Sequence, residues 1–139
     1  ERAYMNGKIG MVFGVFDGLH AGHQQFLKAA ASKTEKLIVV VTRDDVSYNR
    51  KGFKPQRGEL ERVKALKAFD PSFTVVLGDL HDDDWHVVDE YDPERIFLGY
   101  DQGEIGEALR KMGIPYTFLD AYRATEFKSS IINAPREGS

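Results

Sequence analysis

Two of the chain's four histidines lie in one short glycine-rich stretch, FGVFDGLHAGHQQFL, which runs from Phe13 to Leu27. His20 and His23 are three positions apart, so on a helix their imidazoles would lie about 60° apart, on one side. The first turn of a helix carries partial positive charge, and two ring donors beside it make a site for an anion such as phosphate. The spacing therefore predicts that both histidines bind one phosphate group. The alternative is a polar helix start with two solvent-facing histidines.

The residues around the two histidines predict a tight loop. Gly14 follows an apolar run and would let the chain turn with its backbone amides exposed. Phe16 is expected to anchor the loop in the core. Asp17 and Gly18 are typical of a turn, in which Asp17 would cap the following helix. Gly22 lacks a side chain that would crowd a ligand between the histidines.

Apolar runs alternate along the chain with segments of helical spacing. The runs are nearly continuous, as in strands that are buried on both faces of a parallel sheet. In one helical segment, Leu60, Val63 and Leu66 fall on one side. The alternation predicts an α/β fold with a Rossmann-like open parallel five-stranded sheet and helices on both faces. The expected strands are residues 9–13, 37–41, 73–77, 95–98 and 116–119, and the expected helices are residues 20–32, 57–69, 82–91 and 103–112.

The length and the loops suggest how such a sheet would carry a site. A chain of 139 residues without an internal repeat or linker predicts one domain over residues 1–139, with residues 1–6 and 135–139 as flexible ends. Sheets of this kind bind ligands at the carboxyl ends of their strands, near the reversal of strand order. The functional loops should therefore follow the strands, and residues 42–56 form the longest of them.

The composition argues against several classes of protein. There are no cysteines, which excludes disulfides and thiolate metal sites. A net charge of −3 argues against a nonspecific nucleic-acid binder, which normally needs a basic surface. No apolar run is long enough to span a bilayer, and the first residues do not resemble a signal peptide. We therefore expect a cytoplasmic protein that binds neither nucleic acid nor a membrane.

Two stretches carry a family resemblance. GVFDGLHAGH resembles the G-T-F-D-x-x-H-x-G-H signature of the nucleotidyltransferase superfamily, and FKSSII, from Phe127 to Ile132, resembles the second signature, I-S-S-T before a short helix. The two occur in the family's order, so the resemblance covers nearly the whole chain. Two residues depart from it. Val15 replaces the usual threonine, and Lys128 replaces the first serine, which would bring a charge to the phosphate side.

The resemblance implies that a substrate phosphate attacks the α-phosphorus of a nucleoside triphosphate and expels pyrophosphate. The nucleophile is already an anion, so the protein must chiefly position two repelling anions and stabilise charge. His20, His23 and Lys51 are the expected catalytic residues, with His23 at the α-phosphate. The expected nucleotide-binding residues are Gly14, Val15, Phe16, Asp17, Gly22, Lys54, Gly99, Asp101, Arg123, Lys128, Ser129 and Ser130.

Basic residues in and beyond the longest loop leave alternatives open. Lys51 and Lys54, in RKGFKP, can approach both anions as compact charges on flexible stems, or can belong to a solvated basic loop. Lys51 is favoured because the following glycine lets the chain bend toward the substrate. Arg62, in ELERVKAL, can reach the active site or pair with Glu59 on its own helix, and the sequence does not separate these two interpretations.

The expected cofactor is Mg²⁺, delivered with the triphosphate. The sequence has no cluster of acidic residues and histidines near the phosphate loops, and Mg²⁺ keeps several waters when it binds. Asp17 is the nearest candidate for a single contact to the ion. The expected partners are a nucleoside triphosphate, ATP or CTP, and a small phosphorylated acceptor, FMN or glycerol 3-phosphate. Relatives are often homodimers, so the resemblance also allows a homodimer.

Short motifs favour one branch of the superfamily, the archaeal-type FAD synthases, which join AMP from ATP to FMN. LGYDQ resembles their L-G-P-D-Q, KGFKP resembles K-G-R-K-P, and FKSS resembles H-S-S. YRATE, from Tyr122 to Glu126, instead resembles the R-T-E of the cytidylyltransferases. The alternative function is therefore a CTP-dependent glycerol-3-phosphate cytidylyltransferase, and a nucleotide-binding module without turnover is a third hypothesis.

Overall fold

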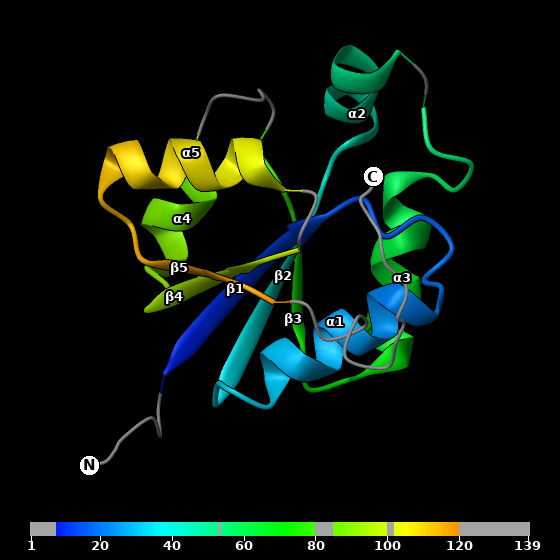
Figure 1. The fold of residues 1–139 in the computed structure, drawn as a ribbon. Helices are drawn as coiled ribbons and strands as arrows, with labels where there is room; N and C mark the ends of the chain where they lie inside the picture. The colour runs from blue at the N-terminus through cyan, green and yellow to red at the C-terminus, as the bar shows by residue number, and fades with distance from the viewer. Residues whose placement is uncertain (1–7, 53, 80–84, 100–101, 120–139) are drawn as a thin grey trace, which may run out of the picture.

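Five parallel strands form the centre of the structure (Figure 1). The computed structural model describes residues 8–52, 54–79, 85–99 and 102–119. The strands are β1 (Ile9–Gly14), β2 (Lys36–Val41), β3 (Thr74–Leu77), β4 (Arg95–Leu98) and β5 (Tyr116–Phe118). The helices are α1 (Ala21–Ala31), α2 (Asp44–Lys51), α3 (Glu59–Phe69), α4 (His86–Tyr91) and α5 (Gly103–Met112).

The strand order places the two halves of the chain on either side of β1. The order is β3-β2-β1-β4-β5, and every neighbouring pair is parallel. The chain therefore moves outward from β1 to β3, returns, and continues outward through β4 and β5. Strand order reverses between β1 and β4, where such sheets bind ligands. The predicted Rossmann-like sheet is confirmed, and each predicted strand lies within one residue of the observed bounds.

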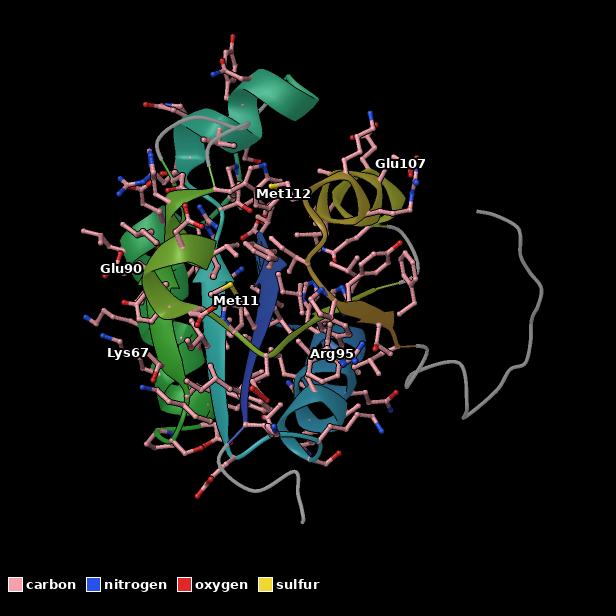
Figure 2. The ribbon with its side chains drawn as sticks, turned by 90° about the vertical axis from the view of Figure 1, so that its left-hand side faces the viewer. Met11, Lys67, Glu90, Arg95, Glu107 and Met112 are labelled. Atoms are coloured by element: carbon pink, nitrogen blue, oxygen red, sulfur yellow. The ribbon has the colours of Figure 1, made fainter. Side chains whose placement is uncertain are left out.

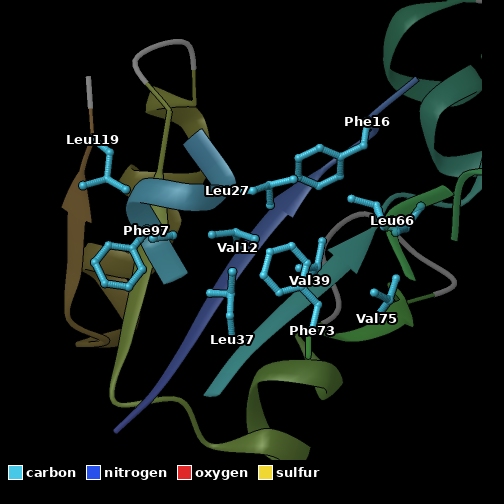
Figure 3. Close-up of a cluster of buried hydrophobic side chains, with 12 residues drawn as sticks. Val12, Phe16, Leu27, Leu37, Val39, Leu66, Phe73, Val75, Phe97 and Leu119 are labelled. Atoms are coloured by element: carbon cyan, nitrogen blue, oxygen red, sulfur yellow. The ribbon is translucent and has the colours of Figure 1, made fainter. Parts of the chain in front are cut away.

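Both faces of the sheet are buried, which explains the continuous apolar runs. Successive side chains of a strand point to opposite faces. In β2, Val39 belongs to the hydrophobic cluster under α1 and α3 (Figure 3), and Ile38 belongs to the cluster under α4 and α5. Leu27 of α1 and Leu66 of α3 complete the first cluster, and Leu109 of α5 completes the second. The prediction of helices on both faces is confirmed.

Helix α2 replaces much of the loop expected at residues 42–56. It stands beyond the carboxyl end of the sheet (Figure 1). Its sequence, DDVSYNRK, is polar apart from Val46 and Tyr48, so apolar periodicity could not reveal it. Asp44 and Asp45 occupy its first turn, where acidic side chains are favourable, and Gly52 ends it in the left-handed region at a φ of 85°. The prediction of an unstructured loop here was wrong.

The buried side of α3 also differs from the prediction. Leu60 is 68% exposed, whereas Arg62 and Leu66 are fully buried. The apolar pattern predicted that Leu60 would be buried, but Arg62 is buried in its place. The Arg62 guanidinium donates to three acceptors at this position. At other positions charged side chains are exposed and apolar ones are buried: Lys67 on α3 and Glu107 on α5 are exposed, and Met11 is buried in the sheet (Figure 2). None of the described helices is long and apolar enough to cross a membrane.

Candidate active site

The loop between β1 and α1 has an unusual backbone. Phe16 and Leu19 lie in the left-handed region at φ values of 54° and 45°, and Gly18 lies at 92°. Each non-glycine residue in this region costs about 1 kcal/mol or more. The turn is therefore made at residues 16–19, and the prediction that Gly14 makes it was wrong, since β1 continues through Gly14. The missing side chain at Gly14 instead leaves room for the Phe16 ring, which a Cβ there would approach to 2.7 Å.

Contacts on several sides hold this loop in place. The Phe16 side chain is 4% exposed and belongs to the core cluster (Figure 3), as predicted for an anchor. Gln24 Nε2 donates to the carbonyl oxygen of Leu19 at 3.0 Å. Arg62 Nη1 donates to the carbonyl oxygen of Val15 at 2.8 Å. The strained conformation is thus fixed from the core, from α1 and from α3.

Asp17 binds the segment before α3 and does not cap α1. Its Oδ2 accepts from the backbone N–H of Gln56 at 2.8 Å, and its Oδ1 accepts from that of Arg57 at 3.2 Å. The Arg57 guanidinium lies 3.8 Å from Oδ1. The predicted capping role was wrong because α1 begins only at Ala21, which makes His20 the residue at the cap position. Both oxygens of the Asp17 carboxylate already have donors.

His20 caps α1 through its side chain. Its backbone is extended, and its Nδ1 accepts from the backbone N–H of Gly22 at 3.1 Å. Because Nδ1 uses its lone pair in this bond, the neutral ring carries its proton on Nε2 and can donate from that side. Gly22 is needed close to this ring: a Cβ there would lie 3.1 Å from Cε1 of His20. The glycine therefore makes room for the histidine itself.

The two imidazoles of the predicted phosphate site lie face to face. The His20 and His23 rings are stacked, with centroids 3.7 Å apart and planes 19° apart. Phe16 meets His23 edge-on, at a centroid distance of 5.5 Å. The anchor of the strained loop thereby also sets the position of His23. The structure brings the two histidines together at the first turn of α1, on the carboxyl side of the sheet, where an anion would meet the helix N-terminus.

Gln102 joins the loop after β4 to the end of β1. Its Oε1 accepts from the backbone N–H of Gly99, and its Nε2 donates to the carbonyl oxygen of Phe13, both at 2.8 Å. The predicted nucleotide-binding residue Gly99 is thereby held beside the loop that follows β1. Sequence reasoning did not single out Gln102, although its place in LGYDQ and its amide's need for partners offered a signal.

Of the two sequence interpretations of Arg62, the structure agrees with the one in which the side chain reaches toward the site. Arg62 does not pair with Glu59. Its Nη2 donates to Oδ1 of Asp44 at 2.6 Å, and it reaches the site loop through the carbonyl oxygen of Val15. A buried arginine on a helix gives no separate signal in the apolar pattern.

Comparison with known proteins shows the family of this chain. Residues 11–132 match the cytidylyltransferase-like family. The chain belongs to this family. It is 35% identical to an FAD synthase of Thermococcus sibiricus, over 86% of this chain and 85% of that protein. It is 37% identical to an FAD synthase of Aciduliprofundum boonei, over 91% of this chain and 85% of that protein.

A solved structure is also similar to this chain. The crystal structure of a lipopolysaccharide core biosynthesis protein from Thermoplasma volcanium superposes with a TM-score of 0.68 at 33% identity. The match covers 80% of this chain and 93% of that one. The predicted membership of the nucleotidyltransferase superfamily is confirmed, and with it the prediction that the chain is an enzyme of this class.

Two basic residues of the predicted site, Lys51 and Lys54, lie at the end of α2 and just after it. Lys51 is the last residue of this helix, so the expected loop position was wrong; its backbone is described and its side chain is not. Lys54 lies 3.9 Å from Oδ1 of Asp45, with both side chains largely exposed, an arrangement that stabilises little. The other predicted nucleotide-binding residues fall outside the described part of the chain: Asp101, Arg123, Lys128, Ser129 and Ser130.

Within residues 8–52, 54–79, 85–99 and 102–119, no group of three or more histidine, aspartate or glutamate side chains could hold an ion. Each carboxylate oxygen of Asp17, the single candidate for a contact to Mg²⁺, accepts from one backbone amide in this structure, so the side chain has a structural role whether or not it meets the ion.

Proposed function

We propose that this nucleotidyltransferase transfers AMP from ATP to FMN, which forms FAD and releases pyrophosphate. The observation that carries the choice of substrates is the 35–37% identity, over most of both chains, to relatives named FAD synthase. The motifs LGYDQ and KGFKP favour the same branch. The geometry supports nucleotidyl transfer through the stacked histidines at the first turn of α1.

The reaction is a displacement at phosphorus. A phosphate oxygen of FMN forms a bond to the α-phosphorus of ATP, and the bond from that phosphorus to the bridging oxygen of the β-phosphate breaks. Pyrophosphate leaves with the electron pair. The attacking phosphate is already an anion, so no base has to remove a proton. Mg²⁺ would arrive with the triphosphate, and the chemistry that it would supply is neutralisation of negative charge on the pyrophosphate.

The protein's own part is to hold donors where charge develops. His20 is preorganised because its cap bond orients the ring and leaves Nε2 as a donor. His23 is held between His20 and Phe16, and we assign it to the α-phosphate. Donors fixed before the reaction do not have to reorient during it, which is the main source of electrostatic catalysis. The N-terminus of α1 adds its partial positive charge.

The remaining contacts extend this assignment. We propose that Lys51, the last residue of α2, contacts the transferring phosphate; the KGFKP motif and the position of α2 beyond the carboxyl edge of the sheet (Figure 1) support this role. The backbone of residues 14–17 and of Gly99 would line the nucleotide. Asp101, Arg123, Lys128, Ser129 and Ser130 stay predictions from the family resemblance, as do a cytoplasmic location and a homodimer.

A pyrophosphate-release assay tests the proposal. The protein is incubated with Mg²⁺ and each of ATP, CTP and GTP, combined with FMN or with glycerol 3-phosphate. We expect release only with ATP and FMN, together with an equal amount of FAD measured by chromatography. Release only with CTP and glycerol 3-phosphate would establish the cytidylyltransferase alternative. Binding of a triphosphate without release in any combination would establish a nucleotide-binding module.

A further inference from the structure

Arg62 is a fully buried charged side chain, and all its partners belong to loops and helix ends around the site. The residue is 0% exposed. Its Nε donates to the carbonyl oxygen of Arg57 at 2.9 Å, its Nη1 to that of Val15 at 2.8 Å, and its Nη2 to Oδ1 of Asp44 at 2.6 Å. These three acceptors belong to the segment before α3, the loop after β1 and the first residue of α2.

Stability alone does not explain a charge at this position. Burying a charged group is expensive unless it is paired and hydrogen-bonded, and a well-packed apolar residue often stabilises a core more. The neighbouring inward residue of the same helix, Leu66, shows what ordinary core packing uses. What Arg62 provides, and an apolar side chain cannot, is three directed hydrogen bonds to separate segments.

The bond to Val15 acts at the start of the strained turn. Val15 directly precedes Phe16, the first residue in the left-handed region, and the turn ends at Leu19, next to His20. A backbone of this kind persists only where its surroundings fix it. The bond from Arg62 fixes the carbonyl from which the turn begins, and Asp17 fixes the next part of the loop against residues 56 and 57.

The bond to Asp44 continues into α2. Asp44 Oδ2 accepts from the backbone N–H of Glu59 at 3.3 Å, and Glu59 Oε1 accepts from the backbone N–H of Asp44 at 2.8 Å. The two helices therefore cap each other at their first residues, where carboxylates are favourable. Arg62 is bound to the same Asp44 side chain, so the start of α2 and the site loop share one guanidinium.

We propose that Arg62 is a positioning residue for nucleotidyl transfer, whose buried guanidinium holds the Val15 loop and the start of α2 in one fixed geometry. It acts through the two histidines at one end and through α2 at the other, and it does not touch the substrate. The proposal rests on nucleotidyl transfer but is independent of whether FMN is the acceptor.

The first test separates positioning from folding. Arg62→Met keeps much of the volume and removes all donors, Arg62→Lys keeps the charge with one donor group, and Leu109→Ala is a control in the opposite core cluster. Below the melting temperature of each variant, we expect Arg62→Met to lower kcat by about tenfold or more with a smaller change in KM, because a misplaced loop weakens transition-state contacts. Arg62→Lys should recover part of kcat, and Leu109→Ala should retain it.

The same kcat in Arg62→Met and Leu109→Ala, at equal folded fractions, would overturn the proposal. If Arg62→Met does not fold, Asp44→Asn is the second variant: it leaves Arg62 in place and removes the charge of its partner. We expect a similar fall in kcat, and an unchanged kcat would equally overturn the proposal.

A readout that needs no turnover distinguishes this proposal from the proposed function. The chain has four histidines, so their imidazole proton resonances can be followed individually by NMR. We expect Arg62→Lys and Asp44→Asn to shift the His20 and His23 resonances, and Leu109→Ala to leave them in place. If the wild type releases no pyrophosphate, the proposed function fails, and unshifted resonances would then overturn the positioning role.

Discussion

His20 combines two tasks in one ring. Its Nδ1 satisfies a backbone N–H at the start of α1, and its Nε2 side is left to donate to a ligand. The bond that stabilises the helix therefore also orients the donor. Stability and activity should respond differently to substitutions that keep one task and remove the other.

Two substitutions at His20 separate these tasks. Asparagine is a good helix cap, so His20→Asn should unfold in urea like the wild type, whereas His20→Ala should lose about 0.5–2 kcal/mol of unfolding free energy. Both remove the Nε2 donor, and a hydrogen bond to a charged group contributes about 1.5–3 kcal/mol. We therefore expect kcat/KM to fall about tenfold to a hundredfold in both. Full activity of His20→Asn would limit His20 to capping.

Asp17 gives a second prediction at this scale. In Asp17→Asn the side chain keeps one acceptor for the two amides of Gln56 and Arg57, and we expect the unfolding free energy to fall by about 1–3 kcal/mol. The loosened loop should also lower kcat. Raising the Mg²⁺ concentration should not restore activity, since the carboxylate binds the two backbone amides and not the ion. Recovery of kcat at high Mg²⁺ would instead identify Asp17 as a ligand of the ion.

Among the elements, those with apolar periodicity were predictable and α2 was not. The strands and α5 were found within one residue of their bounds, because their burial is visible in the residue types. Among the α2 side chains that the structure describes, only Val46 and Ser47 are buried. Contacts with α3 support the start of the helix, where Asp44 and Glu59 cap each other across 15 positions. The buried side of α3 was also missed, because the hydrogen-bond partners of Arg62 lie outside α3 and leave no pattern in the sequence of that helix.

The end of α2 carries the next prediction. Lys51 is the last helical residue, and Gly52 turns the chain away in the left-handed region. A cation at a helix C-terminus typically stabilises the helix by about 0.3–1 kcal/mol, so Lys51→Ala should change the melting temperature little. Loss of a charged contact to phosphate should lower kcat about tenfold to a hundredfold. Lys64→Ala, an exposed lysine on α3, is the control, and equal rates for the two variants would remove Lys51 from the site.

At the scale of the whole molecule, the site depends on contacts between distant parts of the chain. The meeting of His20 and His23 could be predicted, because they lie within one helical turn. The contacts that fix their surroundings could not. Arg62 and Asp44 are 18 positions apart, Asp17 and Gln56 are 39 apart, and Gln102 and Phe13 are 89 apart. Such pairs meet only because parallel strands bring their carboxyl ends to one edge.

The site at this edge should receive Mg²⁺ together with ATP and should not bind the ion by itself. Mg²⁺ prefers oxygen ligands and keeps several waters, so it binds readily to the triphosphate. Each oxygen of the Asp17 carboxylate already accepts a hydrogen bond from a backbone amide. We expect excess chelator to abolish nucleotidyl transfer and added Mg²⁺ to restore it. A ligand that binds the native state raises its melting temperature. Mg²⁺ alone should therefore leave the melting temperature unchanged, while Mg²⁺ with ATP should raise it. A rise with Mg²⁺ alone would show that the protein itself holds the ion, and full activity in chelator would show that transfer does not need it.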